Sequence, residues 1–254
     1  MTTIATVDNS PTFDPVDWEN VRAVYKKVHA DFHVLTRPFG IQVSQETDRD
    51  LAHLICVIDS VDRCLDEIET GEQRKAFSEE LLCYLSGKTD ELFHPSILDE
   101  LRERLGVLFR LICRRDIQAR FCATVKSIFE ETELKRQATS PAEMISHLKT
   151  EWRLTGVLTT LVLGQPNAKF EKFFYLCCEM MTAVDTIEDA KIDFESGQLT
   201  VPPSFGLYFR LVCVFLLPMP KLFWRFPDRL SLLRYAASFI RHEYFPARNP
   251  RESG

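Results

Sequence analysis

Carboxylates recur at a fixed spacing around Asp189. Asp185, Asp189 and Asp193 are four residues apart, and each step of four along an α-helix turns the side chain only about 40° further round, so all three share one stripe. Like charges at this spacing destabilise a helix by about 0.2–0.5 kcal/mol per pair, and aspartate is a poor helix former. Because helix stability does not explain this column, we expect it to face a cation.

A second acidic column lies earlier in the chain. Asp59, Asp62 and Asp66 follow one another at i, i+3 and i+7, which again confines them to one stripe of a helix. In both columns apolar or small residues precede the acids on the same face. They are Ala52, Ile55 and Cys56 before the first column, and Phe174, Cys178, Met181 and Thr182 before the second. If the two helices lie side by side in the same sense, the acids meet at one mouth of an apolar cavity.

Paired hard oxygen ligands are typical of a magnesium site. Mg²⁺ keeps several waters and is usually held by one or two carboxylates together with substrate phosphate oxygens, so the pattern favours a phosphorylated substrate. The predicted metal ligands are Asp59, Asp62, Asp66, Asp185, Asp189 and Asp193. His29 and His33, one helical turn apart, are ligand types for a transition metal. The sequence shows no third ligand near them, and we expect them to be surface histidines.

The two columns resemble the metal-binding signatures of the class I isoprenoid synthases. The D-x-x-D-x-x-x-D pattern from Asp59 to Asp66, the second motif ending in Gly197-Gln198-Leu199, and the segment 151–156 look most like the large terpene cyclases of the tetraprenyl-β-curcumene synthase type. The squalene/phytoene synthase branch is the alternative. Its second motif is matched from Asp185 to Pro202, with Asp185 in place of that family's asparagine.

This resemblance implies an enzyme with a Mg²⁺ cluster that grips the diphosphate of an allylic prenyl substrate and promotes its departure. The carbocation would then react in an apolar pocket. Terpene cyclisation, the work of a carbon–oxygen lyase, is slightly favoured over head-to-head condensation by a prenyltransferase. A catalytically inactive homologue that serves as a helical partner subunit is a further alternative. The implied catalytic residues are Asp59, Asp62, Asp185, Asp189 and Arg153.

Four cations are candidates for diphosphate binding. Lys149 and Arg153 lie four apart on the helix before the Asp185 column, and Arg234 and Arg241 lie near the C-terminus. Arg153 is the best candidate, because it sits among apolar residues where its charge needs a partner, and a guanidinium suits bidentate phosphate contact. Aromatic walls for a carbocation would come from Phe174, Tyr175 and Trp152, although we expect these to be core residues.

The elements that must position these residues are predicted to be helices throughout. Capping residues, prolines and glycines bound apolar periodicity of helical spacing, and strand alternation is nearly absent. The expected helices span about 14–36, 46–69, 72–86, 96–114, a segment ending near 136, 141–163, a long helix after Pro166 that Gly197 closes, 204–217 and 227–245. We predict an all-α bundle of eight to ten helices, forming a single domain over residues 13–248 between flexible termini at 1–12 and 249–254.

Composition narrows the possible classes of function and the possible cellular location. With 254 residues, 45% of them hydrophobic, the chain can bury one large core, and its net charge of −6 argues against a nucleic-acid groove. The eight cysteines lie in apolar helical patterns and indicate reduced thiols, and the first 11 residues lack a signal-peptide pattern, so we expect a cytoplasmic protein. The most apolar segment, Leu211 to Leu217, is too short to cross a membrane. The longer segment from Phe205 to Phe226 could rest on a bilayer surface, as a peripheral contact.

Overall fold

The structure is a computed structural model that describes residues 16, 18, 21–95, 97, 99–165 and 167–234. Within these residues it contains nine α-helices with both ends described, the start of a further helix at residue 229, one short 3₁₀ helix and no strand, so the all-α prediction is confirmed. The elements are α1 (Ala23–Thr36), the 3₁₀ helix η1 (Arg37–Phe39), α2 (Gln45–Asp66), α3 (Gly71–Leu85), α4 (Asp99–Arg114), α5 (Gln118–Gln137), α6 (Pro141–Leu163), α7 (Ala168–Glu195), α8 (Phe205–Leu216) and α9 (Met219–Arg225).

The long helices begin and end where local chemistry dictates. At the start of α6, the Ser140 hydroxyl accepts a hydrogen bond from the Glu143 backbone at 3.3 Å, with Pro141 in the first turn, as predicted. The reciprocal bond of Glu143 reaches one residue further back than expected, to the backbone of Thr139 at 2.9 Å. The helix ends at Gly164 in the left-handed conformation (φ 67°), which glycine adopts without steric penalty.

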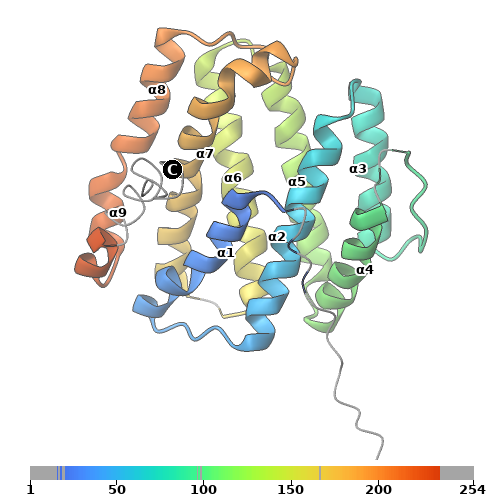
Figure 1. Cartoon of the computed structure of the whole chain (residues 1–254), viewed down its shortest axis with the longest axis horizontal. Helices are drawn as coiled ribbons and strands as arrows, with labels where there is room; N and C mark the ends of the chain where they lie inside the picture. Colours follow the sequence, from blue (N-terminus) through green and yellow to red (C-terminus); the bar gives the residue numbers. More distant parts are fainter. Residues whose placement is uncertain are drawn as a thin grey trace, which may run out of the picture.

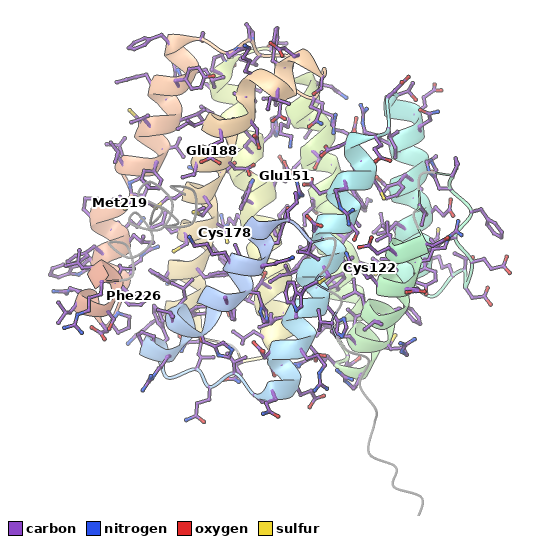
Figure 2. All side chains as sticks on the ribbon, viewed as in Figure 1. Cys122, Glu151, Cys178, Glu188, Met219 and Phe226 are labelled. Atoms are coloured by element: carbon purple, nitrogen blue, oxygen red, sulfur yellow. The ribbon has the colours of Figure 1, made fainter. Side chains whose placement is uncertain are left out.

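The helices form a bundle in which α6 is central. It packs against α5, α7, α2 and α8, while α4 packs on the far side of α2 (Figure 1). Helix α1 crosses the front of the bundle between α2 and α7 (Figure 1). Side chains fill the space between the ribbons (Figure 2), and the largest fully buried ones include Phe77, Phe121, Phe170 and Phe173.

The C-terminal third differs from the prediction in one respect. The expected proline-rich loop after residue 217 contains a helix, α9, because Pro220 falls in its first turn, where its missing N–H has no partner to lose. The next helix begins at residue 229, behind an Asp228 side chain that accepts from the Ser231 backbone at 3.1 Å. The first helix begins at Ala23 and not near Asp14 as predicted, since residues 16, 18, 21 and 22 are not helical. The predicted helix start around Ser96 and the predicted helix end near residue 245 lie outside the described residues.

One stretch has the length and composition of a membrane span. Phe205–Arg225 has a mean hydropathy of 1.5, and only 17% of its most apolar window is buried in the bundle. It comprises α8 and α9, which lie along the outer edge of the bundle (Figure 1).

Candidate acidic site

The two aspartate columns converge at one end of the bundle. The charge of Asp62 raises the pKa of Asp185, and the charge of Asp193 raises that of Asp66. Figure 1 shows α2 and α7 running in the same sense, as the sequence argument required. The helices do not pack directly on each other along their length; α6 contacts both.

The carboxylates of this cluster are partly buried and act on one another, so their ionised forms are disfavoured. Partial burial is the largest cause that raises the pKa of Asp185 to about 7, followed by the charges of Asp189 and Asp62. Burial and the charge of Asp62 likewise raise the pKa of Asp66 to about 6. Burial and Asp189 raise the pKa of Asp193. Carboxylates whose ionised forms are disfavoured in this way are stabilised by a cation placed among them.

Two cations of α5 complete the site, and the sequence reasoning missed both. Burial alone would lower the pKa of Lys135, but the charges of Glu151 and Asp62 outweigh it and raise that pKa. Its Nζ lies 2.9 Å from Oε2 of Glu151. Arg136 is also partly buried, and its positive charge acts to lower the pKa of Asp66. Its Nε has no hydrogen-bond partner among the described residues. The signal available in the sequence was the pair itself, two cations at the end of an otherwise amphipathic helix.

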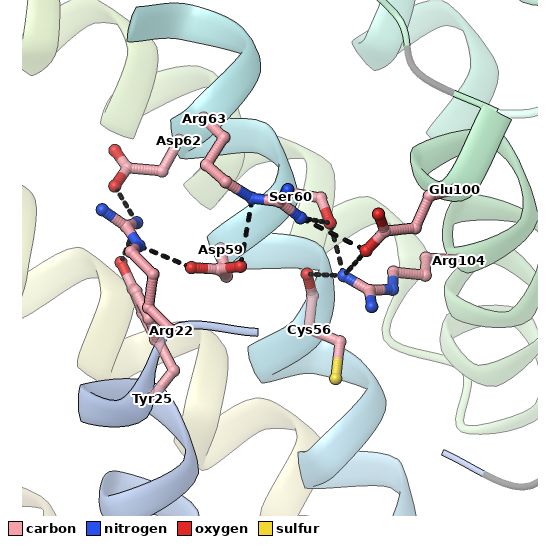
Figure 3. Close-up of polar contacts among 9 residues, drawn as sticks. All are labelled: Arg22, Tyr25, Cys56, Asp59, Ser60, Asp62, Arg63, Glu100 and Arg104. Atoms are coloured by element: carbon pink, nitrogen blue, oxygen red, sulfur yellow. Dashed lines mark hydrogen bonds and ion pairs between the residues drawn. The ribbon is translucent and has the colours of Figure 1, made fainter. Parts of the chain in front are cut away.

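Arg22, just before α1, bridges the first column. Its Nε donates to Oδ1 of Asp59 at 2.6 Å, and its Nη2 pairs with Asp62 (Figure 3). Asp59 is fully buried, and Oδ2 of the same carboxylate faces Nε of Arg63 at 3.3 Å. Asp59 therefore has two arginine partners, and it is less available as a metal ligand than the sequence predicted.

The network continues away from the acids into α4. Arg63 reaches Glu100 at 3.2 Å, and the buried Arg104 donates to the Ser60 hydroxyl at 2.6 Å and to the Cys56 carbonyl at 3.3 Å (Figure 3). These contacts fix the C-terminal half of α2, and so the direction in which its aspartates project.

The residues present fit Mg²⁺ in donor chemistry. Asp62, Asp66, Asp185, Asp189 and Asp193 supply only hard oxygen donors, and burial followed by the charges of neighbouring carboxylates raises the pKa values of Asp66 and Asp185. The hydroxyl of Thr182, one turn before Asp185 on the same stripe, is buried without a hydrogen-bond partner among the described residues. Within that same part of the chain, no three His, Cys, Asp or Glu side chains already stand close enough to hold a metal ion. Binding would therefore have to draw the carboxylates together.

The apolar wall below the acids is packed against side chains. Phe174 stacks on Phe170 with ring centroids 5.3 Å apart, and Phe32 of α1 meets Phe174 edge-on at 5.6 Å. Ile55 and Cys56 on α2 are buried as well. These residues form the expected apolar layer, and Phe174 is a core residue, as the sequence analysis favoured.

The structure places the cations chosen from the sequence elsewhere. Lys149 and Arg153 lie 3.6 and 4.0 Å from the carboxylate oxygens of Glu179, on another side of α7. Arg153 is exposed and lines a pocket together with residues of α7 and α9. Arg234 is exposed at the end of the described chain, and Arg241 lies outside it. The cations near the acids are instead Lys135 and Arg136.

The two histidines of α1 have a partner that the sequence did not reveal. Nε2 of His33 lies 2.8 Å and Nε2 of His29 3.2 Å from Oδ1 of Asp48, at the start of α2. One carboxylate oxygen serves both rings, so the cluster ties α1 to α2, close to the opposite end of α2 from the acidic site.

Comparison of the sequence and the structure with family models, with curated proteins and with solved structures gives no match. The functional assignment rests on the residues of the acidic site.

Proposed function

We propose that the protein is a Mg²⁺-dependent enzyme that ionises an allylic prenyl diphosphate at the acidic site, with terpene cyclisation favoured over head-to-head condensation. The observation that carries this proposal is the convergence of Asp62 and Asp185. They lie 123 positions apart in the sequence, yet their charges act on each other at one end of the bundle. Two acidic stripes with a repulsive interaction between them and cations beside them are what a metal–diphosphate site requires.

Each group at the site has a role in this reaction. Asp62 and Asp66 from α2 and the three aspartates of α7 would hold the metal. When bound, Mg²⁺ neutralises the diphosphate and favours its departure. Lys135 and Arg136 present fixed positive charge to the phosphate oxygens as the carbon–oxygen bond breaks, and fixed charge is most effective where water is excluded. Arg22, just before α1, and Tyr25, in its first turn, lie at this end of the site.

A binding experiment tests the site without assuming turnover. The melting temperature is measured with Mg²⁺ alone, with inorganic diphosphate alone and with both. A ligand that binds only the folded state stabilises it, by about 2.7 kcal/mol at one hundred times its Kd, so the shift with both should exceed the sum of the separate shifts. Asp189→Asn should abolish the joint shift. Glu188→Gln, one residue earlier on α7 but off the stripe, should leave it unchanged.

Incubation with prenyl diphosphates from C10 to C25 and Mg²⁺ then identifies the reaction. A product of unchanged carbon number, independent of NADPH, supports cyclisation. A product of doubled carbon number assigns the protein to condensation instead. The enzyme proposal is wrong if no chain length turns over and no joint thermal shift occurs.

A second candidate, an inactive homologue acting as a helical partner subunit, is favoured by two contacts. Arg22 already neutralises Asp59 and Asp62, and Phe32 packs on Phe174 where a substrate chain would lie. This candidate predicts a joint thermal shift that is absent or small, and no turnover. A joint shift together with turnover excludes it.

A further inference from the structure

Helix α8 carries an exposed apolar stripe on its outer side. Its four members lie at i, i+4, i+7 and i+11, which keeps them on one narrow face. They are Phe205, Phe209, Val212 and Leu216, with exposed fractions of 85, 59, 41 and 54%. The inner side of the same helix buries Leu207 and Leu211 completely. The helix is thus apolar on two faces, and a continuous exposed face of this kind marks an interaction surface.

The segment that bears the stripe is free of acidic residues. Between Glu195 and Asp228 the sequence contains no Asp or Glu, but it contains Arg210, Lys221 and Arg225. The whole chain has a net charge of −6, so this surface has the opposite sign to the rest of the protein. Charge complementarity therefore favours an anionic partner.

A basic pocket adjoins α9. It has a volume of about 280 Å³ and is lined by Arg153, Lys172, Lys221 and Arg225, with Glu179 as its one acid. Nη1 of Arg225 donates to the Lys172 carbonyl at 2.8 Å, which fixes this arginine between α7 and α9. The volume is close to the lower end of the range for small-ligand pockets, about 300 Å³, and the charge is that of a phosphate site.

Trp224 is an exposed aromatic residue beside a cation of the pocket. It is 73% exposed and lies three residues from Lys221 on α9, so the two side chains are neighbours on the helix surface. The guanidinium of Arg229 lies over its ring, 4.4 Å from the centroid. A tryptophan flanked by cations is typical of the interface between lipid headgroups and acyl chains.

The bundle contacts of this segment favour lying on a membrane over crossing one. Leu207 and Leu211 of α8 and Leu222 of α9 are buried against the other helices, and the break at Pro218 separates the two helices. A spanning helix would have to give up this packing, whereas an interfacial helix keeps it.

We propose that α8 and α9 dock the protein on an anionic membrane surface, with the α8 stripe among the headgroups and a lipid phosphate in the basic pocket. The proposal is independent of the reaction at the acidic site.

Flotation of the full chain with vesicles tests it. Vesicles of phosphatidylcholine alone are compared with vesicles that also contain phosphatidylglycerol, at about 0.1 M and about 1 M salt. Binding is expected only with the anionic lipid, and it should weaken at the higher salt. Phe209→Ser should reduce the partition coefficient roughly tenfold, whereas Phe93→Ser, at a 73% exposed position between α3 and α4, should not change it.

The basic pocket is tested by charge reversal. Lys221→Glu should weaken binding to the anionic vesicles by roughly tenfold or more, and the exposed Lys75→Glu on α3, with the same change in net charge, should have little effect. Thermal melts establish that each variant folds.

Three outcomes would overturn the proposal. One is a wild-type chain that does not float with the anionic vesicles, even if inorganic phosphate raises its melting temperature. Another is a dimer that Phe209→Ser converts to a monomer without any vesicle binding, which assigns the stripe to a second copy. The third is binding that resists alkaline carbonate, which indicates a spanning segment.

Discussion

Nε of Arg22 lies 2.6 Å from Oδ1 of Asp59, a carboxylate that is fully removed from solvent. The arginine stands before α1 and the acid lies near the C-terminal end of α2, so the contact fixes the first helix against the acidic site. A cation that binds the first aspartate column therefore finds the guanidinium of Arg22 already in place.

Arg22→Ala should destabilise the protein by about 1–3 kcal/mol, because it leaves the buried Asp59 with Arg63 as its remaining cation. Urea denaturation measures the change. Arg102→Ala is the matched control, since its side chain is 44% exposed against 42% for Arg22, but its partner Asp99 is 96% exposed. An exposed pair of this kind contributes about 0–1 kcal/mol. Equal effects of the two substitutions would contradict the bridging role of Arg22.

Asp185→Asn should stabilise the protein more at pH 8 than at pH 5. The pKa of Asp185 is about 7 in the folded protein and about 3.9 in an unfolded chain. Between these values the folded state binds more protons than the unfolded state, so the free energy of unfolding falls as the pH rises from about 4 to 7. Asparagine removes this loss.

The expected difference at pH 8 is a rise of a few degrees in melting temperature, because Asp185 is open to water and solvent screens part of the repulsion. Melting curves from pH 5 to 8 provide the measurement. Glu188→Gln, exposed on the same helix, should follow the wild-type curve. A wild type and an Asp185→Asn variant with parallel curves would show that the pKa of Asp185 is not raised in the folded protein.

Gly156→Ala should destabilise the protein, although alanine favours a helix. A Cβ at this position would lie 2.9 Å from Sγ of Cys178 and 3.2 Å from Cδ1 of Tyr175, so α6 and α7 would have to separate. Overpacking of this kind costs about 1–3 kcal/mol. At Gly106 on α4 the nearest atom is 3.6 Å away, and Gly106→Ala should stabilise the protein by about 0.5–1 kcal/mol. Thermal or urea unfolding should therefore give opposite signs for the two substitutions.

Lys135→Gln should impair the proposed reaction far more than Lys149→Gln. Lys135 acts on the charges of Asp62 and Asp185, whereas Lys149 faces Glu179. Loss of one fixed charge that stabilises a departing anion lowers kcat by roughly 10²-fold or more. The kcat of Lys135→Gln should therefore be lower than that of Lys149→Gln by a factor of this order. Turnover of the prenyl diphosphate that the wild type accepts is the readout. If Lys149→Gln proves the more damaging, the diphosphate lies on the Glu179 side of α7.

Substitution of the proposed metal ligands should reduce turnover more than substitution of these cations. Asp62→Ala and Asp189→Ala should each lose several orders of magnitude in turnover, because metal-assisted departure of the diphosphate is the difficult step. Arg153→Ala should lose less. Single-turnover rates with and without Mg²⁺ separate the loss of chemistry from the loss of binding.

The sequence alone determined most of the helices and the two acidic stripes. The start of α6 at Ser140 and Pro141 and its end at Gly164 depend on residues within one turn, and the spacing from Asp185 to Asp193 fixes a stripe whatever the surroundings are. Interactions of this range are local, so they could be predicted without knowing which helices become neighbours.

Only the tertiary structure decided which groups meet the acids. Nearness in sequence favoured Lys149 and Arg153, but the packing of α6 on α7 turns both toward Glu179. Arg22 reaches Asp59 across 37 positions, and Lys135 reaches the acids from α5. A side chain's charge partner depends on the order and rotation of whole helices in the bundle, and a difference of one position rotates a side chain by about 100°. No local sequence pattern specifies these charge partners, because they depend on how the apolar faces of all the helices pack together.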